Sequence, residues 1–291
     1  MDLSGQFVPG PCQVCEGRLH PYRHAWLKRC ASCGVLNADF AVAIPDTPGS
    51  QDIDQSMRED GLGVVRDRNN ARLLRDLAAL TPSGGRLLDV GCGPGFLLRA
   101  ASARGFVTEG VEPDADVAPA AGAHAKVRHG YFPNVLAPAD RYDAIVFNDV
   151  LEHIPDLTGT LAAAHAHLEA GGVLALNCPD RRGLFFRVAA LADRLGLSGA
   201  YDRMWQRGLP SPHLWYFTPA NLTEAATRAG FAPVGQLRLD TVAIKGLWAR
   251  IRCVKDQPLL VSMAAYAFAI ATWPIARIAP ADAVVCFFRK S

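Results

Sequence analysis

The stretch Leu87-Leu88-Asp89-Val90-Gly91-Cys92-Gly93-Pro94-Gly95 joins an apolar run to a glycine-rich turn, and a helical pattern begins directly after it at Phe96. A strand, a tight turn and a helix N-terminus in this order bring the backbone close to a ligand, because glycine has no Cβ and tolerates positive φ. The pattern predicts a nucleotide-binding edge in an α/β fold.

The spacing of the glycines separates the classes of nucleotide. A dinucleotide-binding turn has its third glycine three residues after the second, but here Phe96 stands at that position and the third glycine is Gly95. A second strand, expected over 107–112, ends in Glu112, about 20 residues after Asp89, the offset at which an acidic side chain accepts hydrogen bonds from ribose hydroxyls.

The Asp-x-Gly-x-Gly-x-Gly turn followed by an acidic strand end resembles the first motif of the class I S-adenosylmethionine-dependent methyltransferases. The resemblance implies a Rossmann-like α/β fold with a mostly parallel seven-stranded sheet whose last strand is antiparallel. It also implies a cofactor site: the glycines give close backbone approach, Asp89 and Asn148 face the methionine end, and Glu112 faces the ribose. The expected cofactor-binding residues are Asp89, Gly91, Gly93, Gly95, Glu112, Asn148 and Asp149.

A second informative stretch follows an expected strand at 141–147 and reads Asn148-Asp149-Val150-Leu151-Glu152-His153-Ile154-Pro155-Asp156. Polar residues at the carboxyl end of a parallel strand lie where open α/β sheets bind ligands. A helix is expected over 158–169, ended by Gly171-Gly172 before a strand at 173–178. This order resembles the methyltransferase subgroup that includes quinone-biosynthesis and sugar methyltransferases, closely over 86–180.

The candidate catalytic residues are His153, His213 and Glu152. Either histidine can act as a general base, since histidine titrates near neutral pH. A second interpretation takes Asp149, Glu152, His153 and His213 together, because they resemble the set that holds magnesium in plant-type small-RNA 2′-O-methyltransferases. A third, structural interpretation is that the two histidines only support the local backbone.

Four cysteines near the N-terminus form two Cys-x-x-Cys pairs: Cys12 with Cys15, and Cys30 with Cys33, fourteen residues apart. This spacing predicts one tetrahedral, all-thiolate, structural zinc ion. We therefore expect a zinc ribbon over 1–45, a linker over 39–55 and a methyltransferase domain over 46–291. His20 and His24 lie inside the ribbon and are expected at its surface, whereas the remaining four cysteines are expected to be buried thiols.

The remaining pattern places a helix over 57–80, strands over 126–129, 234–242 and 283–289, and a helix over 220–229 with Thr218 as its N-cap and Pro219 as its first residue. A basic and aromatic insertion, 181–212, is expected to cap the site, and its residues Phe185, Phe186 and Trp205, together with four arginines, are expected to suit the headgroup boundary of a membrane. A second, apolar helical insertion covers 243–281. Its uncharged run from Leu259 to Ala276 has three interpretations: a buried or dimer-forming helix, a helix in a membrane surface, or a membrane span.

The formal net charge of +2 shows no footprint of nucleic-acid binding, and half of the residues are hydrophobic, which favours a globular enzyme. We expect methyl transfer to a small molecule, an O-methylation of a sugar or of a lipid-linked intermediate. The alternatives are an RNA methyltransferase that grips RNA with the ribbon, and a catalytically silent interaction module. The absence of a signal-peptide pattern favours the cytoplasm, with peripheral contact at the inner face of the membrane and homodimerisation left open.

Overall fold

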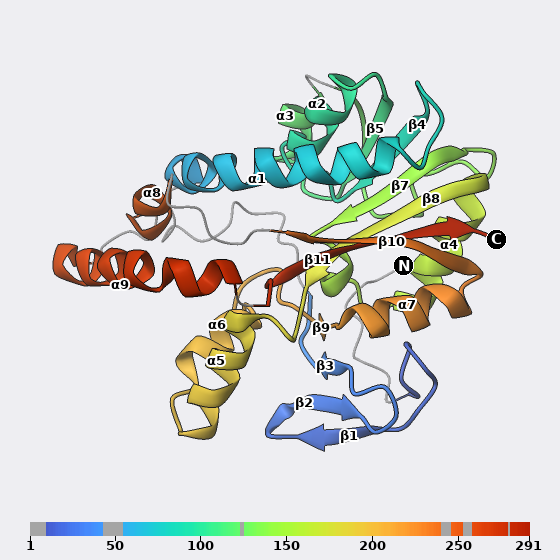
Figure 1. Cartoon of the computed structure of the whole chain (residues 1–291). Helices are drawn as coiled ribbons and strands as arrows, with labels where there is room; N and C mark the ends of the chain where they lie inside the picture. Colours follow the sequence, from blue (N-terminus) through green and yellow to red (C-terminus); the bar gives the residue numbers. More distant parts are fainter. Residues whose placement is uncertain (1–9, 43–54, 123–124, 240–245, 253–257, 279) are drawn as a thin grey trace.

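The computed structural model describes residues 10–42, 55–122, 125–239, 246–252, 258–278 and 280–291. Within them the chain forms a seven-stranded sheet and a smaller four-stranded sheet, which lies at the bottom of Figure 1. The strands of the larger sheet are β4 (Arg86–Val90), β5 (Val107–Glu112), β6 (Lys126–His129), β7 (Tyr142–Asn148), β8 (Leu168–Pro179), β10 (Phe231–Leu239) and β11 (Ala283–Lys290).

The larger sheet has the order β10-β11-β8-β7-β4-β5-β6. Strands β8, β7, β4, β5 and β6 pair in parallel, whereas β11 pairs antiparallel with both β8 and β10. This is the mostly parallel sheet with an antiparallel last strand that the sequence predicts. The predicted strands at 126–129 and 283–289 are confirmed, and the strand expected at 234–242 begins earlier, at Phe231.

Helices cover both faces of this sheet (Figure 1). One face carries α1 (Gln55–Ala78) and α2 (Phe96–Ser102), and α3 (Ala118–Gly122) lies beside α2; the other face carries α4 (Leu157–His167) and α7 (Pro219–Arg228). Helix α1 buries Leu73, Leu74 and Leu77 against the sheet, as its periodicity predicts. Helix α7 begins with the expected Thr218 cap, whose side chain exchanges hydrogen bonds with Asn221.

The boundary between α4 and β8 differs from the prediction. The helix ends at His167, and β8 already begins at Leu168, which pairs with Tyr142. The glycines 171 and 172 therefore lie within β8, where the register with β7 shifts between Tyr142 and Ala144. Gly171 has φ 73°, so the two glycines form a bulge within β8 and do not end helix α4.

The smaller sheet contains β1 (Leu19–Tyr22), β2 (His24–Cys30), β3 (Leu36–Ala38) and β9 (Trp215–Tyr216). Strand β9 comes from the second half of the chain and pairs antiparallel with β3, so that Leu36 faces Tyr216. The backbone N–H of Ala38 donates to the carbonyl of Leu214 at 2.8 Å. The N-terminal segment is thus joined to the larger domain by shared sheet hydrogen bonds.

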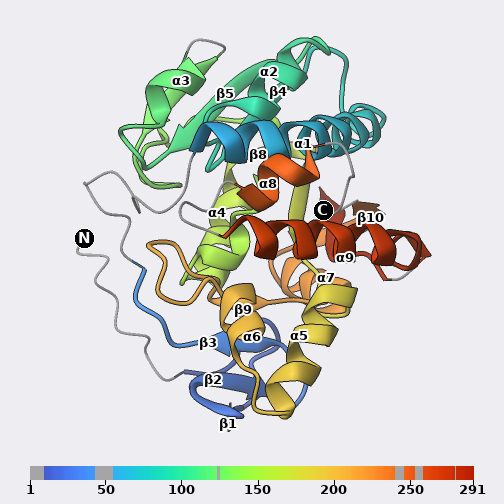
Figure 2. The same cartoon turned by 90° about the vertical axis from the view of Figure 1, so that its left-hand side faces the viewer.

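The insertion at 181–212 forms α5 (Leu184–Arg194) and α6 (Gly199–Met204), which lie beside the smaller sheet (Figure 2). Phe186 and Trp205 are 6% and 0% exposed and pack with Leu27 and Tyr216 of that sheet. Both aromatic residues therefore belong to a core, and the expectation that they face a membrane is wrong. Packing between the insertion and the smaller sheet requires them there.

His24 is also placed differently from the prediction. Its Nε2 lies 2.9 Å from the carboxylate of Asp193 on α5, and Arg23 forms an ion pair with the same carboxylate at 3.2 Å. The His24 ring stacks on Trp26 at 5.0 Å between centroids. His24, expected at the surface of the ribbon, is partly buried and forms part of the contact between the smaller sheet and α5.

The apolar insertion forms α8 (Leu247–Arg252) and α9 (Leu259–Ile278). Helix α9 contacts α8 through the rings of Trp248 and Tyr266, 5.6 Å apart, and it runs alongside α8 in Figure 1. Among the described residues, no helix combines the length and the apolar character that crossing a membrane requires. Residues 43–54 of the linker predicted over 39–55, residues 240–242 of the expected strand, and Cys253 lie outside the described residues.

Candidate active site

A cavity of about 590 Å³ opens at the carboxyl ends of β4, β7 and β8. This is the edge of a parallel sheet at which α/β folds bind ligands. Most of the predicted site residues line it: Asp89, Gly91, Gly93, Asn148, Asp149, Glu152, His153 and His213. Gly95, the last glycine of the turn, and Glu112, which accepts a hydrogen bond from Gly93, are not among the residues that line the cavity.

The three glycines of the turn all have positive φ, at 68°, 51° and 82°. A Cβ on Gly91 would lie 2.7 Å from Val150, and one on Gly95 would lie 2.9 Å from the backbone of Ala121, so the surrounding chain itself requires these glycines. A Cβ on Gly93 would meet open space. Gly93 is therefore the position at which a ligand can approach the backbone.

Two buried carboxylates support the turn. Asp89, at 2% exposed, has an Oδ1 atom without a hydrogen-bond partner, and burial together with the nearby Glu112 raises its pKa. Glu112 accepts hydrogen bonds from the backbone N–H groups of Gly93 at 2.7 Å and Asp114 at 2.9 Å. Glu112 thus fixes the conformation of the turn, in addition to its predicted contact with a ribose.

Asn148 and Asp149 end strand β7, and Asn177 of β8 holds both of them. The amide Nδ2 of Asn177 donates to Asn148 Oδ1 at 2.8 Å and to Asp149 Oδ1 at 3.0 Å. Asp149 has φ 59°, an uncommon conformation for a residue with a side chain, and its N–H donates to the Asn177 carbonyl. These bonds orient the polar ends of two neighbouring strands toward the cavity.

Glu152 and His153 lie in a short 3₁₀ helix, η1 (Leu151–His153), directly after this turn. His213, sixty residues later in the chain, brings its ring to within 4.8 Å of the His153 ring. One side-chain donor atom from each of Glu152, His153 and His213 lies within 4.8 Å of the others. Asp149, expected to complete a set of four, lines the same cavity but is not part of this close group.

The side chains of Glu152, His153 and His213 each have a nitrogen or oxygen atom that can accept or donate a hydrogen bond at the cavity. His153 Nδ1 lies 2.9 Å from the carbonyl of Pro212; a carbonyl can only accept, so Nδ1 carries the proton and Nε2 keeps its lone pair. His213 Nε2 lies 2.9 Å from the amide of Gln206, and its Nδ1 has no partner. Glu152 is 1% exposed, and its Oε2 also has no partner.

Burial sets the protonation of these groups. It raises the pKa of Glu152, and the neighbouring Asp149 adds to that rise. It lowers the pKa of His153 and lowers that of His213 to about 3, with His153 adding to the second shift. Both rings are therefore neutral at pH 7, the state in which imidazole accepts a proton or binds a cation.

The position of His213 depends on segments far apart in the chain. Its N–H donates to the Trp205 carbonyl at 3.0 Å, and the next residue, Leu214, donates to the Glu152 carbonyl at 2.7 Å. The side chain of Asn37, from β3, donates to the Leu214 carbonyl at 3.1 Å. The insertion, the smaller sheet and the loop after β7 thus hold His213 over the cavity together.

The four predicted metal ligands near the N-terminus come together in the structure. Cys12 Sγ lies 3.7 Å from Cys33 Sγ, and Cys15 Sγ lies 3.4 Å from Cys30 Sγ. Four thiolates at roughly 2.3 Å from a tetrahedral zinc ion are about 3.8 Å apart, so the cluster fits one ion with little adjustment. All four ligands come from the protein, which leaves no position for a substrate.

Sequence reasoning missed Asn177, Gln206, Ser211 and Arg66, which also line the cavity. Asn177 had a usable signal, because it is a polar residue at the carboxyl end of an apolar strand, as Asn148 is. Ser211, with its hydroxyl 3.2 Å from His153 Nδ1, and Gln206 come from the insertion, and Arg66 comes from α1. Nothing local in their sequence separates them from ordinary surface residues.

Comparison with known proteins agrees with this geometry. Residues 65–236 match the family described as a methyltransferase domain. The ubiquinone biosynthesis O-methyltransferase of Psychrobacter arcticus is 26% identical over 223 residues, 73% of this chain and 71% of that protein. The protein of the same name from Dinoroseobacter shibae is 29% identical over 171 residues, 55% of this chain and 65% of that protein. The chain thus matches about two thirds of the length of these relatives.

Among solved structures, the cyclopropane synthase MmaA2 from Mycobacterium tuberculosis is similar in fold. Its TM-score is 0.57 at 19% sequence identity, and the match covers 83% of this chain and 90% of that one. At this level of identity the similarity concerns the fold alone.

Proposed function

This chain belongs to the methyltransferase-domain family and is an S-adenosylmethionine-dependent methyltransferase, and we propose that it methylates a hydroxyl oxygen of a small molecule. The observation that carries the proposal is the buried group Glu152, His153 and His213, which faces the cavity beside the glycine turn. An oxygen nucleophile must lose its proton during transfer, and this group supplies proton-accepting or cation-binding atoms where the acceptor would lie.

The residues around the turn fit the expected cofactor. Gly93 leaves open space next to the backbone, and Asp89 points an unpartnered buried carboxylate oxygen into the same region. Glu112 holds the turn and has further lone pairs for ribose hydroxyls. S-adenosylmethionine, when bound, supplies a methyl group already activated by its sulfonium. The protein therefore needs only to align the acceptor and to exclude water.

The donor set of the catalytic group, two neutral imidazoles and one buried carboxylate, also fits a divalent cation. Glu152 has an unpartnered buried oxygen, and among the described residues no cationic side chain is paired with it. A buried carboxylate of this kind is strongly destabilised unless a positive charge or a proton joins it. A cation, when bound, would lower the pKa of the acceptor hydroxyl; without one, His153 Nε2 accepts the proton.

The names of the relatives narrow the expected acceptor. They are ubiquinone biosynthesis O-methyltransferases, so a ring hydroxyl of a quinone precursor is a better first candidate than the hydroxyl of a sugar. A phenolic hydroxyl is also the more acidic of the two, which suits a site whose proton acceptors are neutral. We propose a phenol or catechol as the class of acceptor.

A lipid tail on the acceptor is a further part of the proposal. Helix α5 exposes Phe185, Val188 and Leu191, spaced three residues apart on one side, and the first turn of α9 exposes Leu259 and Leu260. Exposed apolar residues on helices that also carry arginine suit the boundary of a membrane. Phe186 and Trp205 contribute nothing to this surface, because they are buried. The same surface also suits contact with a second copy of the chain.

The acceptor proposal is tested by incubating the full-length protein with methyl-labelled S-adenosylmethionine and catechols with and without a prenyl tail. We expect label on a catechol oxygen in the wild type and at least about 100-fold slower labelling in Glu152→Gln. Label on a ring carbon only, or no label on any catechol, would overturn the proposal. The lipid-tail proposal is tested by sedimenting the wild-type protein and the double variant Val188→Ser/Leu191→Ser with anionic vesicles. We expect the wild type to sediment with the vesicles and the double variant to do so less. A protein that remains in solution as a stable dimer would contradict membrane contact.

A further inference from the structure

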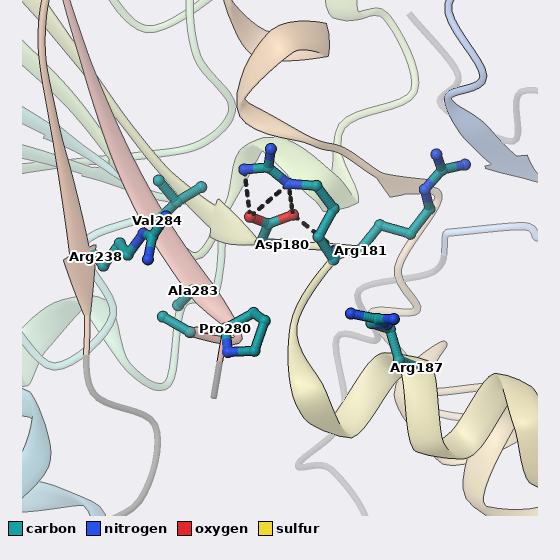
Figure 3. Close-up of a pocket in the computed structure, with 9 residues that line it drawn as sticks. Asp180, Arg181, Arg187, Arg238, Pro280, Ala283 and Val284 are labelled. Atoms are coloured by element: carbon teal, nitrogen blue, oxygen red, sulfur yellow. Dashed lines mark hydrogen bonds and ion pairs between the residues drawn. The ribbon is translucent and has the colours of Figure 1, made fainter. Parts of the chain in front are cut away.

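A second pocket, of about 480 Å³, adjoins the active-site cavity (Figure 3). It lies between the end of β8, strands β10 and β11, and the start of α5. Four arginines line it, together with one acidic residue and small apolar residues: Arg181, Arg182, Arg187, Arg238, Asp180, Pro280, Ala281, Ala283 and Val284. We refer to it as the arginine pocket.

Two of the four arginines are engaged within the protein. The guanidinium of Arg182 pairs with the carboxylate of Asp180, with Nη2 at 3.0 Å from Oδ2. Arg181 donates to the carbonyl of Gly34 in the loop before β3. Asp282, in the adjoining cavity wall, accepts a hydrogen bond from the N–H of Phe185 at 2.7 Å and so faces the start of α5.

The other two arginines, Arg187 and Arg238, are not engaged in this way. Within the described part of the chain, neither guanidinium has a hydrogen-bond or ion-pair partner. Figure 3 shows Arg187 reaching toward the pocket from α5, and Arg238 standing on β10 at the opposite side. The negative charges of Asp180 and Asp282 can balance at most two of the four arginines. Two positive charges, those of Arg187 and Arg238, therefore remain without an acidic partner among the described residues.

Arg187 and Arg238 are exposed, so water screens their mutual repulsion when no ligand is bound, and an anion between them would pair with both charges. The planar guanidinium, with its fork of N–H donors, matches the oxygens of phosphate better than any other side chain does. Two such forks on opposite sides suit a doubly charged group. The chemistry of the pocket thus selects a phosphate or diphosphate group.

The arginine pocket and the active-site cavity are neighbours in the structure. Ala283 lines both of them. At the end of β8, Pro179 borders the cavity and the next residue, Asp180, borders the pocket. One molecule can therefore place one part beside Glu152, His153 and His213, and another between Arg187 and Arg238. The cofactor turn lies in the wall of the cavity and not in the arginine pocket.

We propose that Arg187 and Arg238 bind a phosphate or diphosphate group of the acceptor and so determine which hydroxyl compounds are methylated. This inference deepens the proposed function and rests on it for the identity of the bound molecule. The anion site itself does not depend on methyl transfer. It can therefore be measured separately.

The test is calorimetric titration of the full-length protein with inorganic pyrophosphate at fixed ionic strength. We expect saturable binding in the wild type and a loss of at least about tenfold in affinity in Arg187→Gln/Arg238→Gln, because both charged forks are removed. Arg187→Lys/Arg238→Lys should retain part of the affinity. Arg194→Gln, on the same helix but outside the pocket, is the matched control and should bind as the wild type does.

Two results would overturn the proposal: no saturable binding in the wild type, or equal affinity in the glutamine double variant. Thermal unfolding of each variant checks that the fold is unchanged. Titration with S-adenosylmethionine is run in parallel, so that failure of the methyltransferase proposal is seen independently of the anion site. Vesicles of phosphatidic acid, compared with phosphatidylcholine, then distinguish a lipid-borne phosphate from a soluble one, and the same double variant should abolish either contact.

Discussion

The protein contains two compact groups of potential metal ligands, and they differ in completeness. The four thiols Cys12, Cys15, Cys30 and Cys33 surround one point and together supply the four ligands of a tetrahedral ion, although Cys12 also borders a separate cavity of about 540 Å³. Glu152, His153 and His213 supply only three side chains and face the large cavity. A closed set of four is typical of structural sites, whereas three ligands with an open side are typical of catalytic ones.

The two groups are nevertheless mechanically connected. Strand β3 follows directly after Cys33, and it holds the segment that begins at His213 through the bonds of Asn37 and Ala38 to Leu214. The closed site therefore stabilises the scaffold that positions one side of the open site. The following experiments alter one of the two groups, or a residue that supports the fold around them, and measure activity, cofactor affinity or stability.

The largest effect is expected from Cys30→Ser. Binding of structural zinc contributes on the order of 10 kcal/mol to small zinc domains, so loss of one thiolate should unfold the ribbon or destabilise it by several kcal/mol. Because β3 pairs with β9, methyl transfer should fall about 100-fold or more, while affinity for S-adenosylmethionine changes less than about threefold. Denaturant unfolding, an activity assay and cofactor titration measure the three quantities.

Cys286→Ala is the control for that variant. Cys286 is also buried, but it lies in β11, away from the four-thiol group, and should reduce stability by only about 1 kcal/mol. A zinc content of zero in the wild-type protein would refute the structural assignment. Full activity in Cys30→Ser would show that the two groups are independent.

The next largest effect is expected from Glu152→Gln. Removing a proton-accepting or cation-binding group should lower kcat/KM by about 10²- to 10⁴-fold, with cofactor affinity within about twofold of the wild type. His165→Asn, on α4 and outside the cavity, is the control. Metal analysis sharpens the comparison: two ions per chain in the wild type and one in the variant support a cation at the open site, and one ion in both would favour His153 as the base.

A smaller effect is expected from Glu112→Ala, which should weaken S-adenosylmethionine by about tenfold, equivalent to about 1.4 kcal/mol. The variant loses the predicted ribose contact and the bonds to Gly93 and Asp114. Glu109→Ala, on the same strand but paired with Arg128, should leave cofactor affinity unchanged. Calorimetry on both variants tests this; equal affinities would place the ribose contact elsewhere.

The smallest effect is expected from Gln13→Ala, at the contact between the ribbon and α4. The Oε1 atom of Gln13 accepts hydrogen bonds from the N–H groups of Leu157 and Thr158 at 2.7 and 3.2 Å. Their loss should cost about 1 kcal/mol and lower Tm by a few degrees. Thermal unfolding measures the change. Gln236→Ala, on an exposed position of β10, is the control and should leave Tm unchanged.

Local pattern was a reliable guide wherever the physical cause is local. The apolar run before Asp89, the periodicity of α1 and the Thr218-Pro219 helix start each depend on residues within about one turn of one another, and all three are confirmed. The boundary at glycines 171 and 172 was predicted wrongly because its cause is not local. Glycine breaks either a helix or a strand pattern, and only the pairing of Leu168 with Tyr142 determines which.

By itself the sequence determined the glycine turn and the grouping of four cysteines into one cluster, because fixed spacing along the chain produces both, whereas the mostly parallel sheet was implied by the resemblance of the motifs to a known family. Tertiary structure alone decided that β9 completes the smaller sheet, that Phe186 and Trp205 are buried on it, and that His213 meets Glu152 and His153. It also brought Arg187 and Arg238 to one pocket from elements fifty residues apart. Such contacts depend on how whole faces of helices and sheets pack, and no short stretch of sequence carries that information.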